Sequence, residues 1–220
     1  MTPDLLRQLL ESKKKRQAVA LVTHLVSGKQ YLVTPDDVAE NPDFQDAFRR
    51  DRSGVIGEEF IAIHNPPLRL VIIGAVLIAQ SLIPLAQACG YDVRVIDPRG
   101  AFGTEARFPQ TALQVDWPQD VLPALKMDHR TAFIALTHDP KIDDPALEIA
   151  LKSTVFYIGA LGSRKTQAAR QERLKAAGFD ASSLSRINGP IGLAIGAVGA
   201  AEIAISIMAE ITKVLRLGVA

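Results

Sequence analysis

The chain has 220 residues, of which 48% are hydrophobic and 22% charged, and its formal net charge is +1. This length suits one large domain, or a domain of about 150 residues with a small appendage. The near-neutral charge argues against bulk electrostatic binding to nucleic acid or to an anionic membrane surface. The single cysteine, Cys89, excludes an intrachain disulfide framework and a multi-cysteine metal site. Residues 1–20 show no signal peptide, so we expect a cytoplasmic protein.

The first 65 residues are expected to form a small α+β unit. An amphipathic helix begins at residues 5–10, a hairpin crosses Ser27-Gly28-Lys29, and a short helix at 43–50 precedes a strand at 59–63. No group of side chains with an evident chemical role occurs here. Because Asn65-Pro66-Pro67 forms a stiff boundary, we predict domains at residues 1–65 and 66–220.

From residue 68 onward, strands and helices alternate. Apolar strands are expected at residues 69–73, 92–96, 112–115, 131–136 and 155–158, with helices at 76–89, 145–152, 164–177 and about 200–216. The helix at 145–152 is predicted to start with Asp144 as N-cap and Pro145 at its first position. The uncharged stretch 70–90 is interpreted as a strand and a helix, because Gly74 and Pro84 interrupt it, and no membrane span is expected.

Uninterrupted apolar strands separated by helices indicate a parallel sheet that is covered on both faces. The predicted fold is therefore a doubly wound, Rossmann-like α/β domain, which binds its ligands at the carboxyl ends of its strands. The residues that follow each predicted strand are accordingly the candidates for a binding site.

A glycine-rich turn before the helix at 164–177 is the first candidate. Helix N-termini attract anions, and two basic side chains add formal charge there. The residues concerned are Gly159, Ala160, Gly162, Ser163 as N-cap, Arg164 and Lys165. This pattern predicts a grip for a phosphate or a carboxylate, and the alternative is an ordinary connection between strand and helix. The later basic residues Arg170, Arg173 and Lys175 are expected on a solvated face.

The turn after the first strand of this domain matches a dinucleotide fingerprint only in part. Gly74 and Ala75 form the tight turn, but Val76 stands where pyrophosphate needs a glycine. Asp97 follows 23 positions after Gly74, where a ribose-binding acid occurs in such folds, and Arg99 lies beside it. The pattern supports the fold more than NAD(P), whose binding we expect to be weak or absent.

Polar residues also follow the strand at 131–136. Thr137, His138 and Asp139 could contact a ligand, with His138 able to transfer a proton near neutral pH. The alternative is a turn in which Asp139 bonds its own backbone. Arg107, in the loop after 92–96, is either a bidentate anion clamp or a surface arginine.

The C-terminal part combines a glycine-rich loop with a long helix. Gly192 and its neighbours at 189–199 are expected to line the same cleft as the turn at 159–162. In the helix at about 200–216, Ile203, Ile207 and Ile211 form an apolar stripe. We interpret this helix as part of the core, with a dimer surface as the alternative.

Several long motifs resemble the XdhC/CoxI family, the accessory proteins of xanthine dehydrogenase and carbon monoxide dehydrogenase. The similarity spans about residues 60–216 and includes Leu136-Thr-His-Asp-Pro-Lys141, Phe156-Tyr-Ile-Gly-Ala-Leu-Gly-Ser-Arg-Lys165 and Pro190-Ile-Gly-Leu-Ala-Ile-Gly-Ala197. The resemblance implies a protein that binds molybdenum cofactor, as molybdopterin or a dinucleotide form, and delivers it to the apoenzyme of a molybdenum hydroxylase. It further implies a cysteine desulfurase as a second partner, and we expect a homodimer.

The chain also departs from this family. Longer members carry an N-terminal domain with a Gly-Gly-Cys motif, which is reduced here. Short relatives often have histidine at the positions of Leu77, Gln167 and Asn188, and aspartate at Ala194. These departures count against metal-assisted or acid–base activity, so we expect a binding protein rather than an enzyme. The alternatives are an NAD(P)-linked oxidoreductase that uses His138, and an interaction protein that docks to its client without a ligand.

Overall fold

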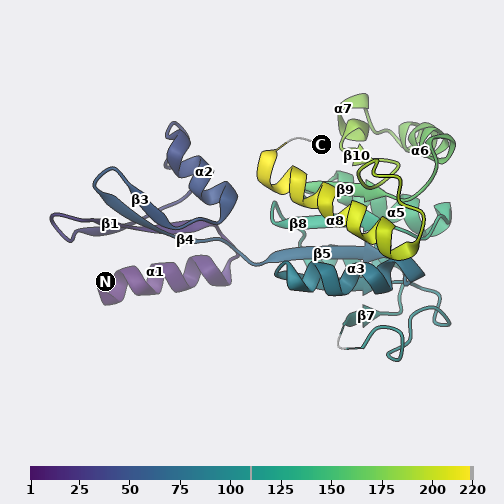
Figure 1. Ribbon diagram of the computed structural model, residues 1–220, viewed down its shortest axis with the longest axis horizontal. Helices are drawn as coiled ribbons and strands as arrows, with labels where there is room; N and C mark the ends of the chain where they lie inside the picture. Colours follow the sequence, from purple (N-terminus) through teal and green to yellow (C-terminus); the bar gives the residue numbers. More distant parts are fainter. Residues whose placement is uncertain (110, 219–220) are drawn as a thin grey trace. The chain divides into compact units, whose positions relative to one another are not determined.

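A computed structural model describes residues 1–109 and 111–218 (Figure 1). The chain divides into two compact units, Met1–Pro66 and Pro67–Ala220. Each unit has its own sheet; the first unit has one hydrophobic core and the second has two, one on each face of its sheet.

The first unit is built on a four-stranded antiparallel sheet with the order β2-β1-β4-β3. Its strands are β1 (Val19–His24), β2 (Gln30–Val33), β3 (Gly54–Ile56) and β4 (Glu59–His64), and its helices are α1 (Pro3–Lys14) and α2 (Pro42–Arg50). The predicted hairpin is confirmed, because β1 and β2 pair antiparallel from Ala20–Val33 to Thr23–Gln30. Phe44 and Phe48 of α2 pack on the sheet to close the core. The short strand β3 was not predicted.

The second unit contains a six-stranded parallel sheet. The alternating pattern predicts a parallel sheet with five of these strands, but not the strand Ile187–Asn188 or the helices Pro118–Leu125 and Ala181–Ser185. Its strands are β5 (Leu68–Ile73), β6 (Tyr91–Ile96), β7 (Ala112–Gln114), β8 (Thr131–Ala135), β9 (Tyr157–Ala160) and β10 (Ile187–Asn188). Its helices are α3 (Leu77–Ala88), α4 (Pro118–Leu125), α5 (Pro140–Leu151), α6 (Arg164–Ala176), α7 (Ala181–Ser185) and α8 (Ala200–Leu217). The predicted α/β fold with a small α+β unit is confirmed.

The order of the strands, β10-β9-β8-β5-β6-β7, is that of a dinucleotide-binding fold. The chain starts at β5 in the middle, moves outward through β6 and β7, and then returns to β8 on the other side of β5. The direction of winding therefore reverses between β5 and β8. Ligands of such folds bind beyond the carboxyl ends of the strands at this reversal point.

Alternate residues of the strands face two separate cores. Leu70 and Ile72 of β5 pack in a cluster with residues of α3 and α8. Val71 and Ile73 pack in the opposite cluster, together with residues of α4, α5, α6 and α7. This alternation explains why β5 and β8 read as nearly continuous apolar runs, since both faces of the sheet are buried there.

Two predicted element boundaries are wrong. Helix α5 begins at Pro140 with Asp139 as N-cap, whose Oδ1 accepts the Lys141 N–H at 2.9 Å. Two Asp-Pro dipeptides occur in succession, and the first begins the helix, so Pro145 lies inside it. Strand β9 runs from Tyr157 to Ala160 rather than over 155–158, so the expected glycine-rich turn is shorter by two residues.

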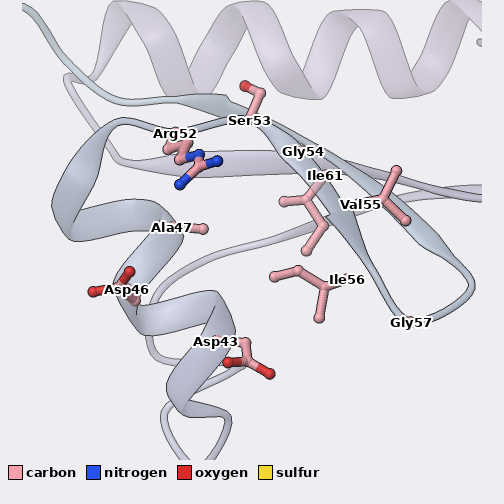
Figure 2. A pocket seen from close by; sticks show the side chains of 10 residues that line it. All are labelled: Asp43, Asp46, Ala47, Arg52, Ser53, Gly54, Val55, Ile56, Gly57 and Ile61. Carbon is pink, nitrogen blue, oxygen red and sulfur yellow. The ribbon is translucent and has the colours of Figure 1, made fainter.

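In the described part of the chain, no helix is long and apolar enough to cross a membrane. The first unit contains a pocket of about 530 Å³, and Figure 2 shows the side chains that line it. Residues between Asp43 and Ile61, from α2, β3 and β4, line it. One of its acids, Asp46, forms ion pairs with Arg49 and Arg50. None of the predicted site residues lines this pocket.

Candidate functional site

The register of the parallel sheet brings the predicted strand ends to one edge. Ile73 of β5 is aligned with Ile96 of β6 and with Ala135 of β8, and Ala135 is aligned with Ala160 of β9. The residues that follow these four positions therefore leave the sheet at the same edge. Cys89 follows α3 just before β6 begins, which places it at the opposite edge.

Gly74 and Thr137 meet at the reversal point. Gly74 has a φ of 112° and its N–H donates to the Ile96 carbonyl at 2.8 Å. A Cβ atom at this position would lie 2.8 Å from Thr137 Cγ2 and 3.2 Å from the Thr137 nitrogen. Only glycine combines this φ with such a close approach. The first glycine of the partial fingerprint thus lets the ends of β5 and β8 touch.

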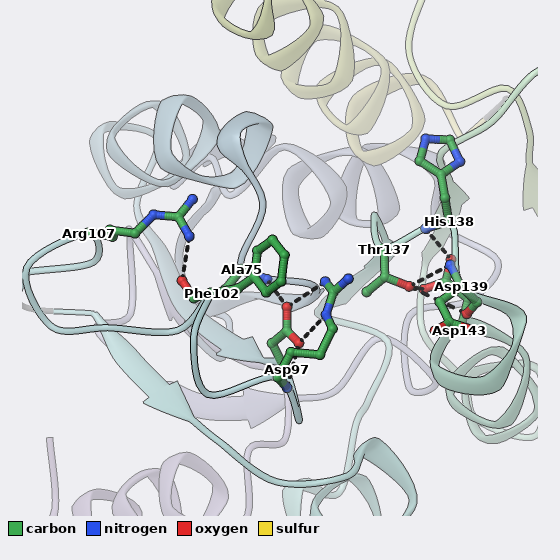
Figure 3. Close-up of polar contacts among 9 residues, drawn as sticks. Ala75, Asp97, Phe102, Arg107, Thr137, His138, Asp139 and Asp143 are labelled. Carbon is green, nitrogen blue, oxygen red and sulfur yellow. Dashed lines mark hydrogen bonds and ion pairs between the residues drawn. The ribbon is translucent and has the colours of Figure 1, made fainter.

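Asp97 is fully buried and bonded within the protein (Figure 3). Its Oδ2 accepts the Ala75 N–H at 2.7 Å and Arg99 Nη2 at 2.8 Å. Its Oδ1 accepts the Arg99 N–H at 3.0 Å and Arg99 Nε at 2.9 Å. Burial opposes ionisation, but the hydrogen bonds from Arg99 and Ala75 outweigh it and lower the pKa of Asp97. The acid at the ribose-binding position therefore holds Arg99.

Arg99 and Arg107 organise the loop that follows β6. The Arg99 guanidinium lies over the Phe102 ring, with its central carbon 4.4 Å from the ring centroid. Arg107 Nη1 donates to the Phe102 carbonyl at 2.7 Å, and its guanidinium lies 5.5 Å from the Phe108 ring centroid. Arg107 thus stabilises this loop, a role that neither sequence interpretation included.

The side chain of Asp143 in α5 holds the turn after β8 by hydrogen bonds (Figure 3). Thr137 Oγ1 donates to Asp143 Oδ1 at 2.6 Å, and the His138 N–H donates to Asp143 Oδ2 at 3.1 Å. The Asp139 N–H in turn donates to Thr137 Oγ1 at 3.1 Å. His138 takes a left-handed φ of 62° and its side chain is exposed. Of the three predicted contacts, His138 is the one presented to solvent, while Asp139 serves as the cap of α5.

A buried polar group under this edge was missed by sequence reasoning. Burial raises the pKa of Asp143, against its hydrogen bonds and the charge of Arg170. Arg170 is only 2% exposed, which corrects its predicted place on a solvated face, and burial lowers its pKa. Its guanidinium donates to the Leu161 carbonyl at 2.9 Å and to Gln167 Oε1 at 2.6 Å. The buried stripe Gln167, Arg170 and Leu174 has helical spacing but one apolar member, so no hydrophobic pattern indicated it.

The start of α6 has the predicted cap. Ser163 Oγ accepts the Thr166 N–H at 3.1 Å, and Arg164 and Lys165 are exposed on the first turn. The N–H groups that begin a helix have no partner within it and can bind an anion. Gly159 and Ala160, however, are buried in β9. A Cβ on Gly159 would lie 2.5 Å from Ile191 Cδ1, so this glycine admits the following loop rather than a ligand.

The loop at 189–199 is attached to β9 and α8. The Ile191 N–H donates to the Ala160 carbonyl at 3.1 Å, which brings the loop beside the carboxyl end of β9. The Gly192 N–H donates to Glu210 Oε2 at 2.9 Å, and the Tyr157 hydroxyl donates to the same oxygen. Burial, followed by the charge of Glu210, raises the pKa of Tyr157.

The four positions of the family departures lie near this edge or in the polar group beneath it. Leu77 and Ala194 are exposed, and Asn188 Nδ2 donates to the Ile158 carbonyl at 3.0 Å. Gln167 is buried, and its Nε2 has no hydrogen-bond partner among the described residues. In the same part of the chain, no group of three or more His, Cys, Asp or Glu side chains could hold a metal ion.

These features define a Rossmann-like domain whose candidate site lies at the carboxyl edge of its parallel sheet. The family described as the XdhC Rossmann domain matches residues 70–211, and the chain belongs to this family. The resemblance of its motifs to XdhC proteins is thereby confirmed.

Two curated relatives are each 33% identical to the chain. The Molybdenum cofactor insertion chaperone PaoD of Escherichia coli K12 aligns over 150 residues, which are 68% of this chain and 41% of PaoD. A protein of Bacillus subtilis 168 that is named as a probable subunit of xanthine dehydrogenase aligns over 155 residues, 70% of this chain and 45% of that protein. The chain thus spans less than half of either relative.

A solved structure shares the fold. The crystal structure of a xanthine dehydrogenase from Bacillus halodurans matches 96% of this chain and 64% of its own, with a TM-score of 0.69 and 24% identity. At this identity, the match supports the architecture alone.

Proposed function

We propose that this protein binds molybdenum cofactor and delivers it to the apoenzyme of a molybdenum hydroxylase. The observation that carries the proposal is its membership of the XdhC family, together with a relative named as a molybdenum cofactor insertion chaperone. In this proposal the chain is a carrier and the catalysis belongs to its client. A cysteine desulfurase as second partner, a homodimeric state and a cytoplasmic location are parts of the same proposal.

The carboxyl edge fits the anionic part of such a cofactor. A pterin cofactor carries a phosphate, and the first turn of α6 offers backbone N–H groups beside the exposed Arg164 and Lys165. Gly162 precedes this turn with a φ of 151°, and a Cβ there would lie 3.0 Å from Thr166. Arg164 and Lys165 would hold the phosphate, and the lack of a side chain at Gly162 would let the turn pass close to Thr166. When bound, such a group would supply the redox chemistry of its own molybdenum.

The test is the pterin content of the natively purified protein, measured by mass spectrometry and by fluorescence after oxidation. We expect the parent chain to retain a pterin. Arg164→Ala should lower the affinity of the protein for the pterin about tenfold or more, since a hydrogen bond to a charged group contributes about 1.5–3 kcal/mol. Arg164→Lys should recover little, because an ammonium lacks the planar fork of the guanidinium.

Lys175→Ala is the matched control, because Lys175 is an exposed base in the last turn of the same helix. Arg173 is unsuitable, since its Nε lies 2.5 Å from Asp144 Oδ2. Equal losses at Arg164 and Lys175 would attribute binding to the general charge of α6. The absence of any pterin from the parent, after expression with active cofactor synthesis, would refute the proposed function.

A further inference from the structure

We propose that Phe102, backed by Arg99, is the surface on which the planar ring of the ligand stacks. The ligand class is a heteroaromatic ring that carries a phosphate, such as a pterin or a purine nucleotide. This inference rests on the proposed function, because it assigns the ring of the ligand to one place at the same edge of the sheet.

Phe102 is exposed, yet its position is held on both sides. The residue is 43% exposed in the loop that follows β6. Its N–H donates to the Arg99 carbonyl at 2.9 Å. Its carbonyl accepts Arg107 Nη1 at 2.7 Å, the bond drawn in Figure 3. A single exposed phenylalanine is ordinary on a protein surface. One that two arginines hold at the ligand-binding edge of the fold is better explained by contact with a ligand.

The guanidinium behind the ring is immobilised as well. Three donors of Arg99, its backbone N–H, Nε and Nη2, bind the buried carboxylate of Asp97 at 3.0, 2.9 and 2.8 Å. The guanidinium faces the ring at 4.4 Å, within the range of a cation–π interaction. A surface that is already ordered loses little conformational freedom when a ligand binds. Because the Arg99 charge neutralises Asp97, the carboxylate does not repel an anionic ligand.

The loop lies beside the entry to the reversal point. Gln80 Nε2 of α3 donates to the Arg107 carbonyl at 3.3 Å, which attaches the loop to the first turns of that helix. Helix α3 starts three residues after Gly74, so Phe102 belongs to the edge that also presents His138 and the start of α6. Aromatic rings stack on bases without reading their sequence, so both pterins and purines satisfy this geometry.

The experiment uses calorimetric titrations of the full chain with neopterin monophosphate, GMP and inorganic phosphate. Phe102→Ala should weaken binding of the two ring-bearing probes by about five- to one-hundredfold and leave phosphate binding unchanged. Phe102→Trp, which retains a stacking surface, should bind both within about threefold of the parent, on the same stacking argument. Phe60→Ala is the matched control, since Phe60 is 40% exposed in the first unit. Thermal melts of all variants check folding.

The stronger of the two ring-bearing probes identifies the part of the ligand that stacks, and either result supports the proposal. Unchanged affinities in Phe102→Ala would overturn it, as would an equal loss for inorganic phosphate. The content of natively bound pterin separates the two proposals. If the parent and Phe102→Ala retain equal amounts of pterin, the stacking surface is refuted and the proposed function stands. If the parent retains none and binds no probe, both fail.

Discussion

Replacing Asp97 by asparagine tests the assignment of this acid as a structural anchor. The substitution keeps the shape of the side chain but removes the negative charge of the carboxylate, which accepts four hydrogen bonds from Ala75 and Arg99. Breaking a buried ion pair by removing one partner costs about 3–5 kcal/mol. The Arg99 side chain is 30% exposed and can regain water, so we expect the lower end, about 3 kcal/mol. In a chain of this size that lowers the Tm by roughly 6–12 °C.

The pH dependence of this loss has a definite sign. The pKa of Asp97 in the folded protein lies below its ordinary value of 3.8, so the ionised carboxylate stabilises the fold above that value. This contribution disappears as the pH falls through the lowered pKa. The difference in unfolding free energy between parent and Asp97→Asn should therefore be largest near neutral pH and shrink below about pH 4.

Urea unfolding followed by the fluorescence of Trp117 measures this difference, because Trp117 is the only tryptophan of the chain and lies in the second unit. Asp92→Asn is the control, since Asp92 is an exposed aspartate of β6 and should cost less than about 0.5 kcal/mol. A loss below about 1 kcal/mol for Asp97→Asn, or one that persists unchanged in acid, would refute the reasoning.

Three further perturbations test the tight turn at Gly74, the buried hydroxyl of Tyr157 and the binding of nicotinamide cofactors. Gly74→Ala should lower the unfolding free energy by about 2–4 kcal/mol, because the new Cβ meets Thr137. The control is Gly178→Ala, which has a φ of 97° but open space around it and should cost only about 1–2 kcal/mol. Equal urea midpoints for the two variants would disprove the contact. Tyr157→Phe should lower stability by about 1–2 kcal/mol in a thermal melt, since Glu210 loses a buried donor, and an unchanged melt would contradict this. Calorimetry with NADH and NADPH should show no micromolar affinity, because Asp97, the acid at the ribose-binding position, is already hydrogen-bonded to Ala75 and Arg99. Micromolar binding would support the alternative of an oxidoreductase.

The parts of the fold that sequence reasoning predicted are those that local signals determine. Strands β5, β6 and β8 are rich in apolar residues that the two cores bury, so their positions were predicted to within one residue. The N-cap Ser163 and the terminating Gly178 bound α6 through short-range chemistry. The predicted start of α5 was wrong because two Asp-Pro signals compete. The hydrogen bonds that Asp143 accepts from Thr137 and His138 favour the earlier start, since they form once Asp143 lies in the first turn of the helix.

The candidate site was predicted in outline, while its internal bonding was not. The shared edge follows from the fold class, and the exposed Arg164 and His138 lie there. Arg99 is a near neighbour of Asp97 in the sequence, but the bond from the Ala75 N–H to Asp97 and the bond from Arg170 to the Leu161 carbonyl join segments that only the folded chain brings together. The local sequence does not show that a charged residue is buried, because the hydrogen-bond partners that stabilise its buried charge lie in other elements.

Helix α8 also has a consequence for how the protein is made. All six strands of the second unit precede it along the chain, yet its residues Ala204, Ile207 and Ile211 cover the same sheet face as α3. During synthesis, we expect that face to stay partly open until α8 has left the ribosome. Contacts between such distant segments form slowly, and apolar strands that are exposed before α8 packs on them are prone to aggregation. Nascent chains stalled before residue 200 should therefore be held by general chaperones, whereas those that include α8 should be released.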